Sequence, residues 1–299
     1  MGIATVYLLV SATALFWGAN FVLAGTVLSD LPPLWAAAVR FLLGAALMLA
    51  IAMVRREALL GLLRRHALVY LMLGTVGIAA FNLLFFYALQ TTSANNGALI
   101  MAINPLLTTL LAAVFIGEKA TLRHMLALPV ALAGVAVVIS HGEMSRLASL
   151  TFSHGDLLML TATLSWAAYN VLTRRYMPQG SPIAHTSWIM VAGALVLLAA
   201  ALGSDSHIHA LGAKAGAAMA MMVVGGTVLA YLFWGVGIAR LGAGRTAIFI
   251  NLVPVFAMLT GTFIGDVPTG AQLIGGLLVL GGVAISMLQP RRSASSTRA

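Results

Sequence analysis

Aromatic and uncharged polar residues recur at helical spacing within the most apolar stretches of the chain. Thr13, Trp17 and Asn20 lie at positions i, i+4 and i+7, which places them on one face of a helix. Trp166 lies 149 residues after Trp17, and Thr163, Asn170 and Thr173 share its helix face, with Tyr169 alongside. An amide or hydroxyl turned toward hydrocarbon is costly, so these faces should point into the protein. They predict a pathway lined by rings and uncharged hydrogen-bonding groups, which suits a substrate with an apolar or planar side chain.

The candidate substrate site is a set of aromatic and amide side chains from several apolar segments. Its members are Trp17, Asn20, Phe81, Asn82, Phe85, Trp166, Tyr169, Asn170, Tyr231 and Trp234. A single residue of this kind often only bonds a neighbouring helix. The set favours substrate contact, because several of its members pair at the offset of 149 residues. By their depth, we expect an outer gate (Trp17, Asn20, Asn82) and an inner gate (Tyr169, Tyr231, Trp234).

Two prolines interrupt apolar segments at related positions. Pro105 and Pro254 lie near the midpoints of two predicted spans and are also 149 residues apart. Proline removes one helix hydrogen bond and frees the carbonyl four residues earlier, here at Met101 and Ile250. The kinks could act as hinges, present a carbonyl to substrate, or only shape a packing surface. Because the two prolines are placed symmetrically, a hinge role and a static packing role are equally supported by the sequence.

Ionisable residues are scarce within the apolar segments. Arg40 is the single mid-span charge, about 10 Å from the outer end of its helix. It could attract a substrate carboxylate, but snorkelling or bonding to carbonyls of neighbouring helices is favoured. All acidic residues lie in loops or at helix ends, so the usual carboxylate relay of proton-driven pumps is missing.

The same scarcity argues against an enzyme or a metalloprotein. No nucleophile with a base, and no metal-ligand set, lies within the apolar segments. His207 and His209 form a loop pair without further ligands. We therefore expect no catalytic residue, no cofactor and no bound metal.

Composition places these residues in a bilayer. The chain has 299 residues, is 61% hydrophobic and only 8% charged, and has a mean hydropathy of +1.03, whereas soluble domains are about 25% charged. It contains no cysteine, which excludes disulfides and thiolate sites. The net charge of +9 comes from short loops, so it indicates topology and not a nucleic-acid partner.

The apolar runs predict an all-α integral membrane protein with ten transmembrane helices, because each run approaches the roughly 20 residues that a span requires. The first run is too long for a signal-peptide core and is expected to be retained. The predicted spans are 3–27, 33–54, 66–89, 94–117, 121–140, 155–175, 183–203, 214–239, 244–264 and 269–288.

The ten spans divide into two copies of five. Pro33 pairs with Pro182, and, after a one-residue shift, Gly117-Glu118 pairs with Gly265-Asp266. Five is an odd number, so the second copy must enter the membrane from the opposite side, as in the inverted repeats of secondary transporters. The predicted divisions are a first repeat at 1–145, a second at 146–290, and a disordered cytoplasmic tail at 291–299.

Lysine and arginine set the expected orientation. With a cytoplasmic N-terminus, thirteen of these residues lie on the cytoplasmic side, and only Arg146 and Lys214 lie on the other. This asymmetry predicts that both termini of a multi-pass protein are cytoplasmic.

Several motifs resemble a known family. Trp17-Gly18-Ala19-Asn20-Phe21 resembles the WGxNF sequence of the first helix in the drug/metabolite transporter superfamily. The later motifs resemble its duplicated EamA-type pattern: Pro33 with Arg40-Phe41, Asn104-Pro105, Gly117-Glu118, and Gly155-Asp156 before Trp166. The resemblance covers nearly the whole chain and is nearest to a bacterial branch that exports aromatic amino acids. It implies a ten-helix exporter of the bacterial inner membrane, with a cavity bounded by helices 1, 3, 4, 6, 8 and 9. The second copy departs from the motif, with Tyr169 where the first has Asn20.

The expected function is export of amino acids with aromatic or apolar side chains, and of related metabolites, by alternating access. The alternatives are a passive channel or facilitator for small neutral solutes, and an exporter of drugs or other metabolites. The expected partners are a small-molecule substrate and the lipid bilayer, with the protein acting as a monomer.

Overall fold

The structure is a computed structural model. It describes residues 1–88, 90–92, 97, 100–143, 145, 148, 153–206, 210–265 and 267–287. Every regular element in these ranges is a helix, which confirms the predicted all-α class. The predicted disordered tail at 291–299, and Arg146, His207, His209 and Asp266, lie outside the described residues.

The elements of the described chain form ten helical columns. The first half contains α1 (Ile3–Leu28), α2 (Pro33–Val54), a column of α3 (Leu59–Gly74), η1 (Thr75–Ala80) and α4 (Phe81–Ala88), then α6 (Asn104–Ile116) and α7 (Leu122–Ser140). The second half contains α9 (His154–Tyr176), α10 (Pro182–Leu202), a column of α11 (Ala213–Met221), η2 (Met222–Leu229) and α12 (Ala230–Leu241), a column of α13 (Ala243–Ala247), η3 (Ile248–Asn251), α14 (Leu252–Gly261) and η4 (Thr262–Ile264), and α15 (Gly270–Met287).

These columns match the predicted spans closely. Within the described residues, eight are long and apolar enough to cross a membrane, and Ile100–Ile116 is a shorter apolar helix. The remaining column, α9, has 23 residues, and charged residues near both of its ends make it more polar. The predicted span 94–117 begins in residues that the structure does not describe. The third column begins at Leu59 and not at 66, because a short helix joins it across a kink at His66.

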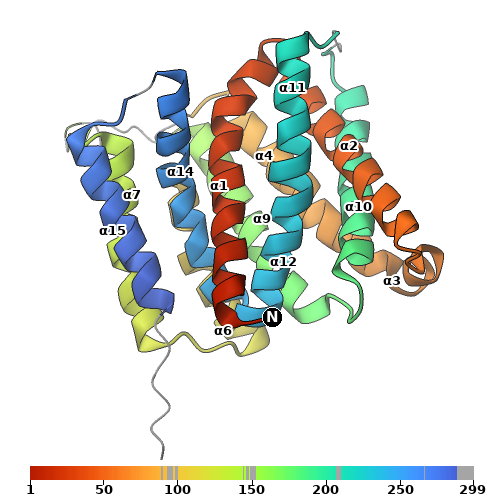
Figure 1. The fold of residues 1–299 in the computed structure, drawn as a ribbon, viewed down its shortest axis with the longest axis horizontal. Coiled ribbons are helices and arrows are strands. Elements are labelled where there is room, and N and C mark those ends of the chain that lie inside the picture. The colour runs from red at the N-terminus through yellow and green to blue at the C-terminus, as the bar shows by residue number, and fades with distance from the viewer. Residues whose placement is uncertain are drawn as a thin grey trace, which may run out of the picture.

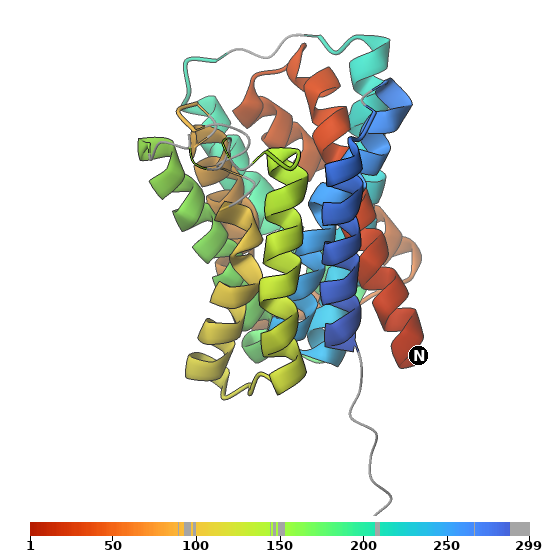
Figure 2. The same ribbon diagram turned by 90° about the vertical axis from the view of Figure 1, so that its left-hand side faces the viewer.

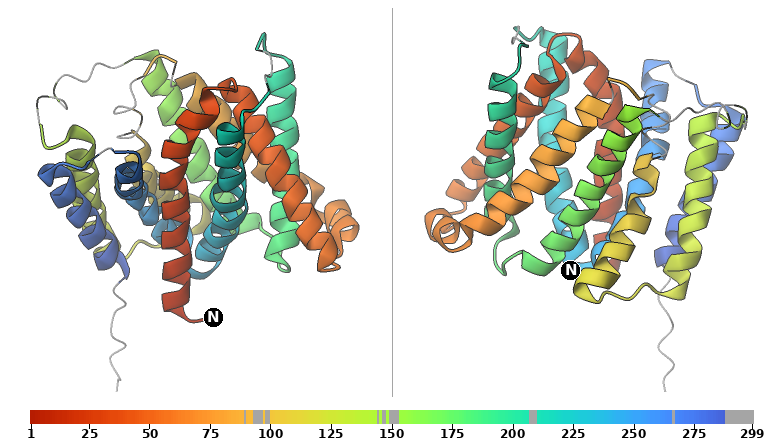
Figure 3. Two further views of the ribbon diagram at one scale, coloured as in Figure 1. Left: turned by 45° about the horizontal axis from the view of Figure 1, so that its top comes forward. Right: turned by 180° about the vertical axis from the view of Figure 1, so that it is seen from behind.

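The two halves run in opposite directions. In Figure 1, α1 rises from the end of the bundle that holds the N-terminus, whereas α9 descends toward that end. The contacts of each helix are likewise exchanged between the two halves. α1 contacts α12 and α14, and its counterpart α9 contacts α4 and α6. Figure 3 shows α9 between α4 and α6 when the molecule is viewed from behind. This is the arrangement of inverted repeats.

Two helix pairs join the repeats to each other. α2 packs on α10, and α7 packs on α15 at the front of Figure 2. Glycines allow the second pair to approach closely. A Cβ on Gly134 would lie 2.6 Å from the backbone nitrogen of Val279, and one on Gly282 would lie 2.8 Å from that of Ala131.

Irregular turns occur at related positions of the repeats. η1 and η2 are π-helical, and adding 149 to the bounds of η1 gives 224–229, which lies inside η2. Gly117 and Gly265 both adopt left-handed conformations, with φ of 66° and 90°, where the fourth and ninth columns end. π turns often mark functional positions in helices.

Both columns that contain the predicted hinge prolines are interrupted just before the proline. α6 begins at Asn104 after a turn at Ile103, and Pro105 is in its first turn. The 3₁₀ turn η3 ends at Asn251, and Pro254 lies in the first turn of α14. Proline fits a helix's first turn because it has no N–H to donate there. Whether these breaks move remains a prediction.

Candidate functional site

A cluster of aromatic rings lies where the two repeats meet. Trp17 comes from α1, Trp166 and Tyr169 from α9, and Tyr231 and Trp234 from α12. The ring centroid of Trp17 is 5.3 Å from that of Trp166 and 5.0 Å from that of Trp234, while Trp166 lies 5.0 Å from Tyr169. Tyr231 is 5.8 Å from Trp166. These are the separations of directly packed rings.

The first repeat extends the cluster from α4. Phe81 lies 5.3 Å from Trp166, and Phe85 stacks on Phe81 at 5.8 Å. Phe41 of α2, which was not among the predicted residues, lies 5.8 Å from Tyr231. The aromatic residues assigned to an outer and an inner gate therefore form one continuous cluster.

Most of this cluster is closed to solvent. Trp234 is 0% exposed, and Trp166, Tyr169 and Tyr231 are at most 5% exposed, whereas Trp17 is half-buried. The arrangement offers ring faces from both halves of the protein to anything that enters between them.

A chain of hydrogen bonds fixes the predicted residue Asn170. Its Oδ1 accepts from Trp234 Nε1 at 2.8 Å, and its Nδ2 donates to Thr108 Oγ1 at 3.4 Å. Thr108 in turn donates to Asn104 Oδ1 at 3.2 Å. Asn170 is fully buried and joins α9 to α6 and α12. In this structure it acts as a tie between helices.

Asn20 and Tyr169 occupy matching positions in the two halves. A Cβ on Gly226 in η2 would overlap the amide of Asn20, and a Cβ on Gly77 in η1 would overlap the ring of Tyr169. Gly77 and Gly226 are themselves 149 residues apart. The departure from the motif at position 169 therefore preserves the contact and changes only the side chain. The offset between the glycines was visible in the sequence, but the predictions did not include them.

Asn82 is turned toward its own helix. Its Nδ2 donates to the carbonyl oxygen of Ile78 at 2.7 Å, inside the π segment η1. The structure thus places Asn82 at the π turn, while the neighbouring Phe81 faces the ring cluster.

Arg40 has the structural contacts that the sequence favoured. Its Nε donates to Thr227 Oγ1 at 2.7 Å, and its Nη2 donates to the carbonyl oxygen of Gly226 at 3.1 Å. The same carbonyl accepts from Trp17 Nε1 at 3.0 Å. Arg40 of α2 and Trp17 of α1 therefore both donate hydrogen bonds to η2.

Two buried side chains, Trp166 and Asn251, contain polar atoms without a hydrogen-bond partner in the described part of the chain. These atoms are Trp166 Nε1 and both amide atoms of Asn251. More than nine-tenths of buried polar groups in proteins are bonded, so each exception needs an explanation. The proximity of Asn251 to Pro254 was evident from the sequence, but its lack of a partner is a property of the fold.

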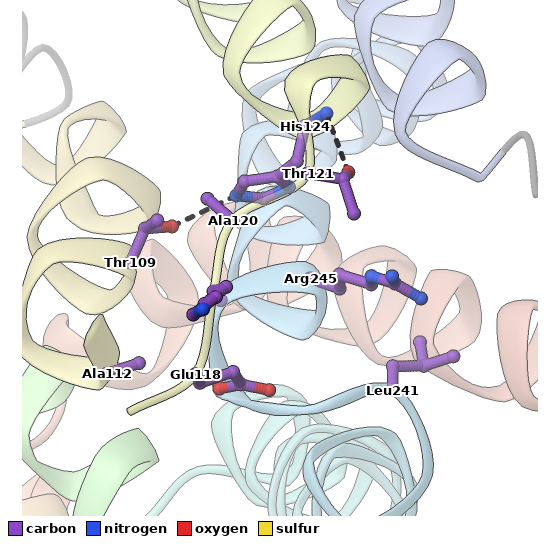
Figure 4. A pocket seen from close by; sticks show the side chains of 10 residues that line it. Thr109, Ala112, Glu118, Ala120, Thr121, His124, Leu241 and Arg245 are labelled. Carbon is purple, nitrogen blue, oxygen red and sulfur yellow. Dashed lines mark hydrogen bonds between the residues drawn. The ribbon is translucent and has the colours of Figure 1, made fainter. Parts of the chain in front are cut away.

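A polar hollow of about 200 Å³ lies at the end of the bundle near the N-terminus. Figure 4 shows Thr109 and His124 on one side of it and Glu118 on another. Glu118 Oε2 accepts from the backbone N–H of Ala243 at 3.0 Å, which ties the first repeat to the second. His124 Nε2 lies 3.0 Å from Thr109 Oγ1. Thr109 donates to the carbonyl oxygen of Pro105 at 2.7 Å, so the hollow connects to the break in the fourth column.

Comparison with known proteins agrees with this architecture. The sequence profile of the EamA-like transporter family matches residues 4–140 and again residues 153–288. "Uncharacterized transporter YyaM" of Bacillus subtilis (strain 168) is 38% identical over 280 residues, which cover 93% of this chain and 92% of that protein. These matches confirm the resemblance that the motifs indicated.

More distant relatives have more specific names. "Probable amino-acid metabolite efflux pump" of Escherichia coli (strain K12) is 27% identical and covers 91% of each chain. "Probable terminal-alkyne amino-acid exporter" of Streptantibioticus cattleyicolor is also 27% identical, over 75% of each chain. A solved crystal structure matches the fold with a TM-score of 0.81 and 21% identity, covering 95% of this chain and 97% of the other.

Proposed function

This chain belongs to the EamA-like transporter family, and we propose on that premise that it exports amino acids across the bacterial inner membrane by alternating access. The preferred substrates carry aromatic or apolar side chains, and related small metabolites share the path. Transport leaves the substrate chemically unchanged, without a cofactor.

The ring cluster between the repeats is the observation that carries this proposal. Trp17, Trp166 and Trp234 pack within 6.2 Å of one another, and the neighbouring Tyr169, Tyr231 and Phe81 extend the surface. No Asp or Glu lies beyond the first turn of any described helix. An apolar or planar side chain can pack here, because each aromatic pair adds about 0.5–1.5 kcal/mol beyond simple burial.

The names of the distant relatives support amino acids as the substrate class. Two of them are described as an amino-acid exporter and an amino-acid metabolite efflux pump. We extend that class to this chain because the ring cluster suits the aromatic and apolar members of it.

The exchange of packing between the halves supports alternating access as the mechanism. If the two repeats swap conformations, the contacts of α1 with α12 and α14 exchange with those of α9 with α4 and α6. The ring cluster would then open first to one side and then to the other. We propose the breaks at Pro105 and Pro254 as hinges, the divisions 1–145 and 146–290 as the moving units, and a cytoplasmic location for both termini.

The test is transport by purified protein in liposomes. We expect saturable uptake of radiolabelled L-phenylalanine and L-leucine, accelerated by preloading the liposomes with the same unlabelled amino acid. L-glutamate and L-lysine serve as charged controls that should not compete. Uptake that rises linearly with concentration and lacks counterflow would indicate a pore. Absence of uptake of any amino acid would refute the substrate class.

A further inference from the structure

We propose that the indole N–H of Trp166 is a hydrogen-bond donor kept free for an acceptor oxygen of the transported molecule. The site then selects molecules that carry a carboxylate or carbonyl next to a planar or apolar group. This inference rests on the proposed transport function and adds to it the chemical group that the site recognises.

The surroundings of Trp166 explain why its N–H is unusual. Five rings surround the indole, those of Trp17, Phe81, Tyr169, Tyr231 and Trp234. Among the described residues, no hydrogen-bond partner lies within reach of its Nε1. A buried donor without a partner loses its hydrogen bonds to water and gains none in return. Such a group is retained when a ligand supplies the missing acceptor.

The other repeat shows what this N–H would do if its role were structural. Trp17 is the counterpart of Trp166 and donates to the carbonyl oxygen of Gly226. The residue that corresponds to Gly226 is Gly77, and Trp166 makes no hydrogen bond to it.

The neighbouring contacts do follow the symmetry. Ser165 Oγ donates to the carbonyl oxygen of Val76 at 2.7 Å, and its counterpart Phe16 lies against Gly225, which corresponds to Val76. Tyr169 lies against Gly77 as Asn20 lies against Gly226. The backbone of η1 therefore lies next to α9 as the symmetry requires. Among these paired contacts, the hydrogen bond of the Trp166 indole N–H to η1 is the one that is missing.

The charge around the cluster favours a carboxylate as the acceptor. Arg40 is anchored to the same carbonyl that binds Trp17, and the Trp17 ring packs directly on Trp166. A positive charge beside the cluster lowers the energy of an anionic group bound within it. A substrate with an aromatic side chain and a carboxylate would satisfy both the rings and the free donor.

The two tryptophans provide a matched test. Trp166→Phe keeps an aromatic ring and removes the N–H, and Trp17→Phe does the same at the position whose N–H is already bonded. Binding of L-phenylalanine and of phenethylamine, which lacks the carboxylate, is measured by calorimetry on purified protein. Thermal unfolding is measured on the same samples.

We expect Trp166→Phe to weaken L-phenylalanine binding by about tenfold to a hundredfold, the effect of losing a hydrogen bond to a charged group. Phenethylamine binding should weaken far less, because this probe has no carboxylate to lose, and the unfolding temperature should fall less than in Trp17→Phe. Trp17→Phe should lower the unfolding temperature, because the carbonyl of Gly226 loses a donor.

Three results would overturn the inference. Equal losses for both probes, together with an unfolding temperature in Trp166→Phe as low as that of Trp17→Phe, would show that the N–H is satisfied by the face of a neighbouring ring. Unchanged L-phenylalanine binding in Trp166→Phe would remove the inference and leave the proposed function intact. A wild-type protein that neither binds nor transports L-phenylalanine would refute both.

Discussion

At the scale of single residues, buried amides in this protein fall into two kinds. Asn170 bonds Trp234 and Thr108 and is part of the framework. Asn251 is equally buried, yet neither atom of its amide has a partner within the described chain. Asn251 belongs to the 3₁₀ turn η3, which packs against both α1 and α6 at the break in the ninth column. The amide of Asn170 stabilises the fold, and the unpaired amide of Asn251 destabilises it.

This difference predicts opposite effects of the same substitution. Asn251→Leu should raise the free energy of unfolding by about 1 kcal/mol, because it removes an unpaired polar group and keeps a similar volume. Asn170→Leu should lower it by about 1–3 kcal/mol, because Trp234 and Thr108 lose a partner. Thermal unfolding in detergent, followed by fluorescence, measures both variants. A lower unfolding temperature for Asn251→Leu would show that this amide is satisfied, for example by a bound water.

At the scale of elements, the two π segments position the residues of the ring cluster. η1 and η2 lie at related positions, and each presents a glycine to the helix that carries a site tryptophan. The close approach of Gly77 to Tyr169 sets how far the α9 rings reach into the cluster. Asn82 and Arg40 bond carbonyls within these segments, so much of the predicted polar lining stabilises the π turns.

The glycine at the first π segment is expected to be irreplaceable. In Gly77→Ala, the added methyl group would collide with the buried Tyr169 ring, which itself packs on Trp166. Overpacking of this kind costs about 1–3 kcal/mol, and the displaced ring should abolish transport. Gly61→Ala in the same column is the control, since its Cβ would meet nothing within 4 Å. Thermal unfolding and liposome uptake measure both. Wild-type behaviour of Gly77→Ala would disprove the contact.

The interrupted columns make a second prediction at this scale. Pro105→Ala and Pro254→Ala should each slow transport severalfold while the amount of folded protein stays the same, because alanine allows the helix to continue through the break. Pro129 lies inside α7, on an exposed position away from the ring cluster. Pro129→Ala should leave uptake of L-phenylalanine unchanged. Equal rates for all three variants would assign the breaks to packing alone.

At the scale of the whole molecule, hydrogen bonds to acidic side chains join the two repeats at both ends of the bundle: at the end away from the N-terminus, Gly212 N–H donates to Asp30 Oδ2 at 2.8 Å. At the end near the N-terminus, Glu118 of the first repeat bonds the backbone of Ala243 in the second. A Cβ on Gly242 would overlap this carboxylate, and Gly242 has a φ of 93°, so glycine is required there on both counts. This contact holds the repeats together across the turn between the eighth and ninth columns.

The inverted arrangement predicts opposite exposure of matching loops. The chain has no cysteine, so single cysteines can be introduced directly. Ser29 follows α1 and Gln179 follows its counterpart α9, and both are exposed. In intact cells, an impermeant maleimide should label Ser29→Cys, and it should label Gln179→Cys only after permeabilisation. Labelling of both variants from one side would exclude inverted repeats.

The helices, their number and the duplication could be predicted from the order of the residues alone. Those features depend on lengths and spacings along the chain: about 20 apolar residues for a span, and an offset of 149 residues that pairs Trp17 with Trp166 and Pro105 with Pro254. The sequence also indicated the aromatic residues of the ring cluster other than Phe41, because rings and amides on one helical face must turn away from lipid.

The roles of those residues depend on contacts that form when the chain folds. Trp17 and Trp166 occupy the same place in the same motif, yet one N–H is bonded and the other is free. Asn170 is a tie between helices, and the aromatic residues predicted for two gates form one cluster. A hydrogen bond depends on the distance between atoms far apart in the chain, and the spacing of residues along a helix does not contain that distance.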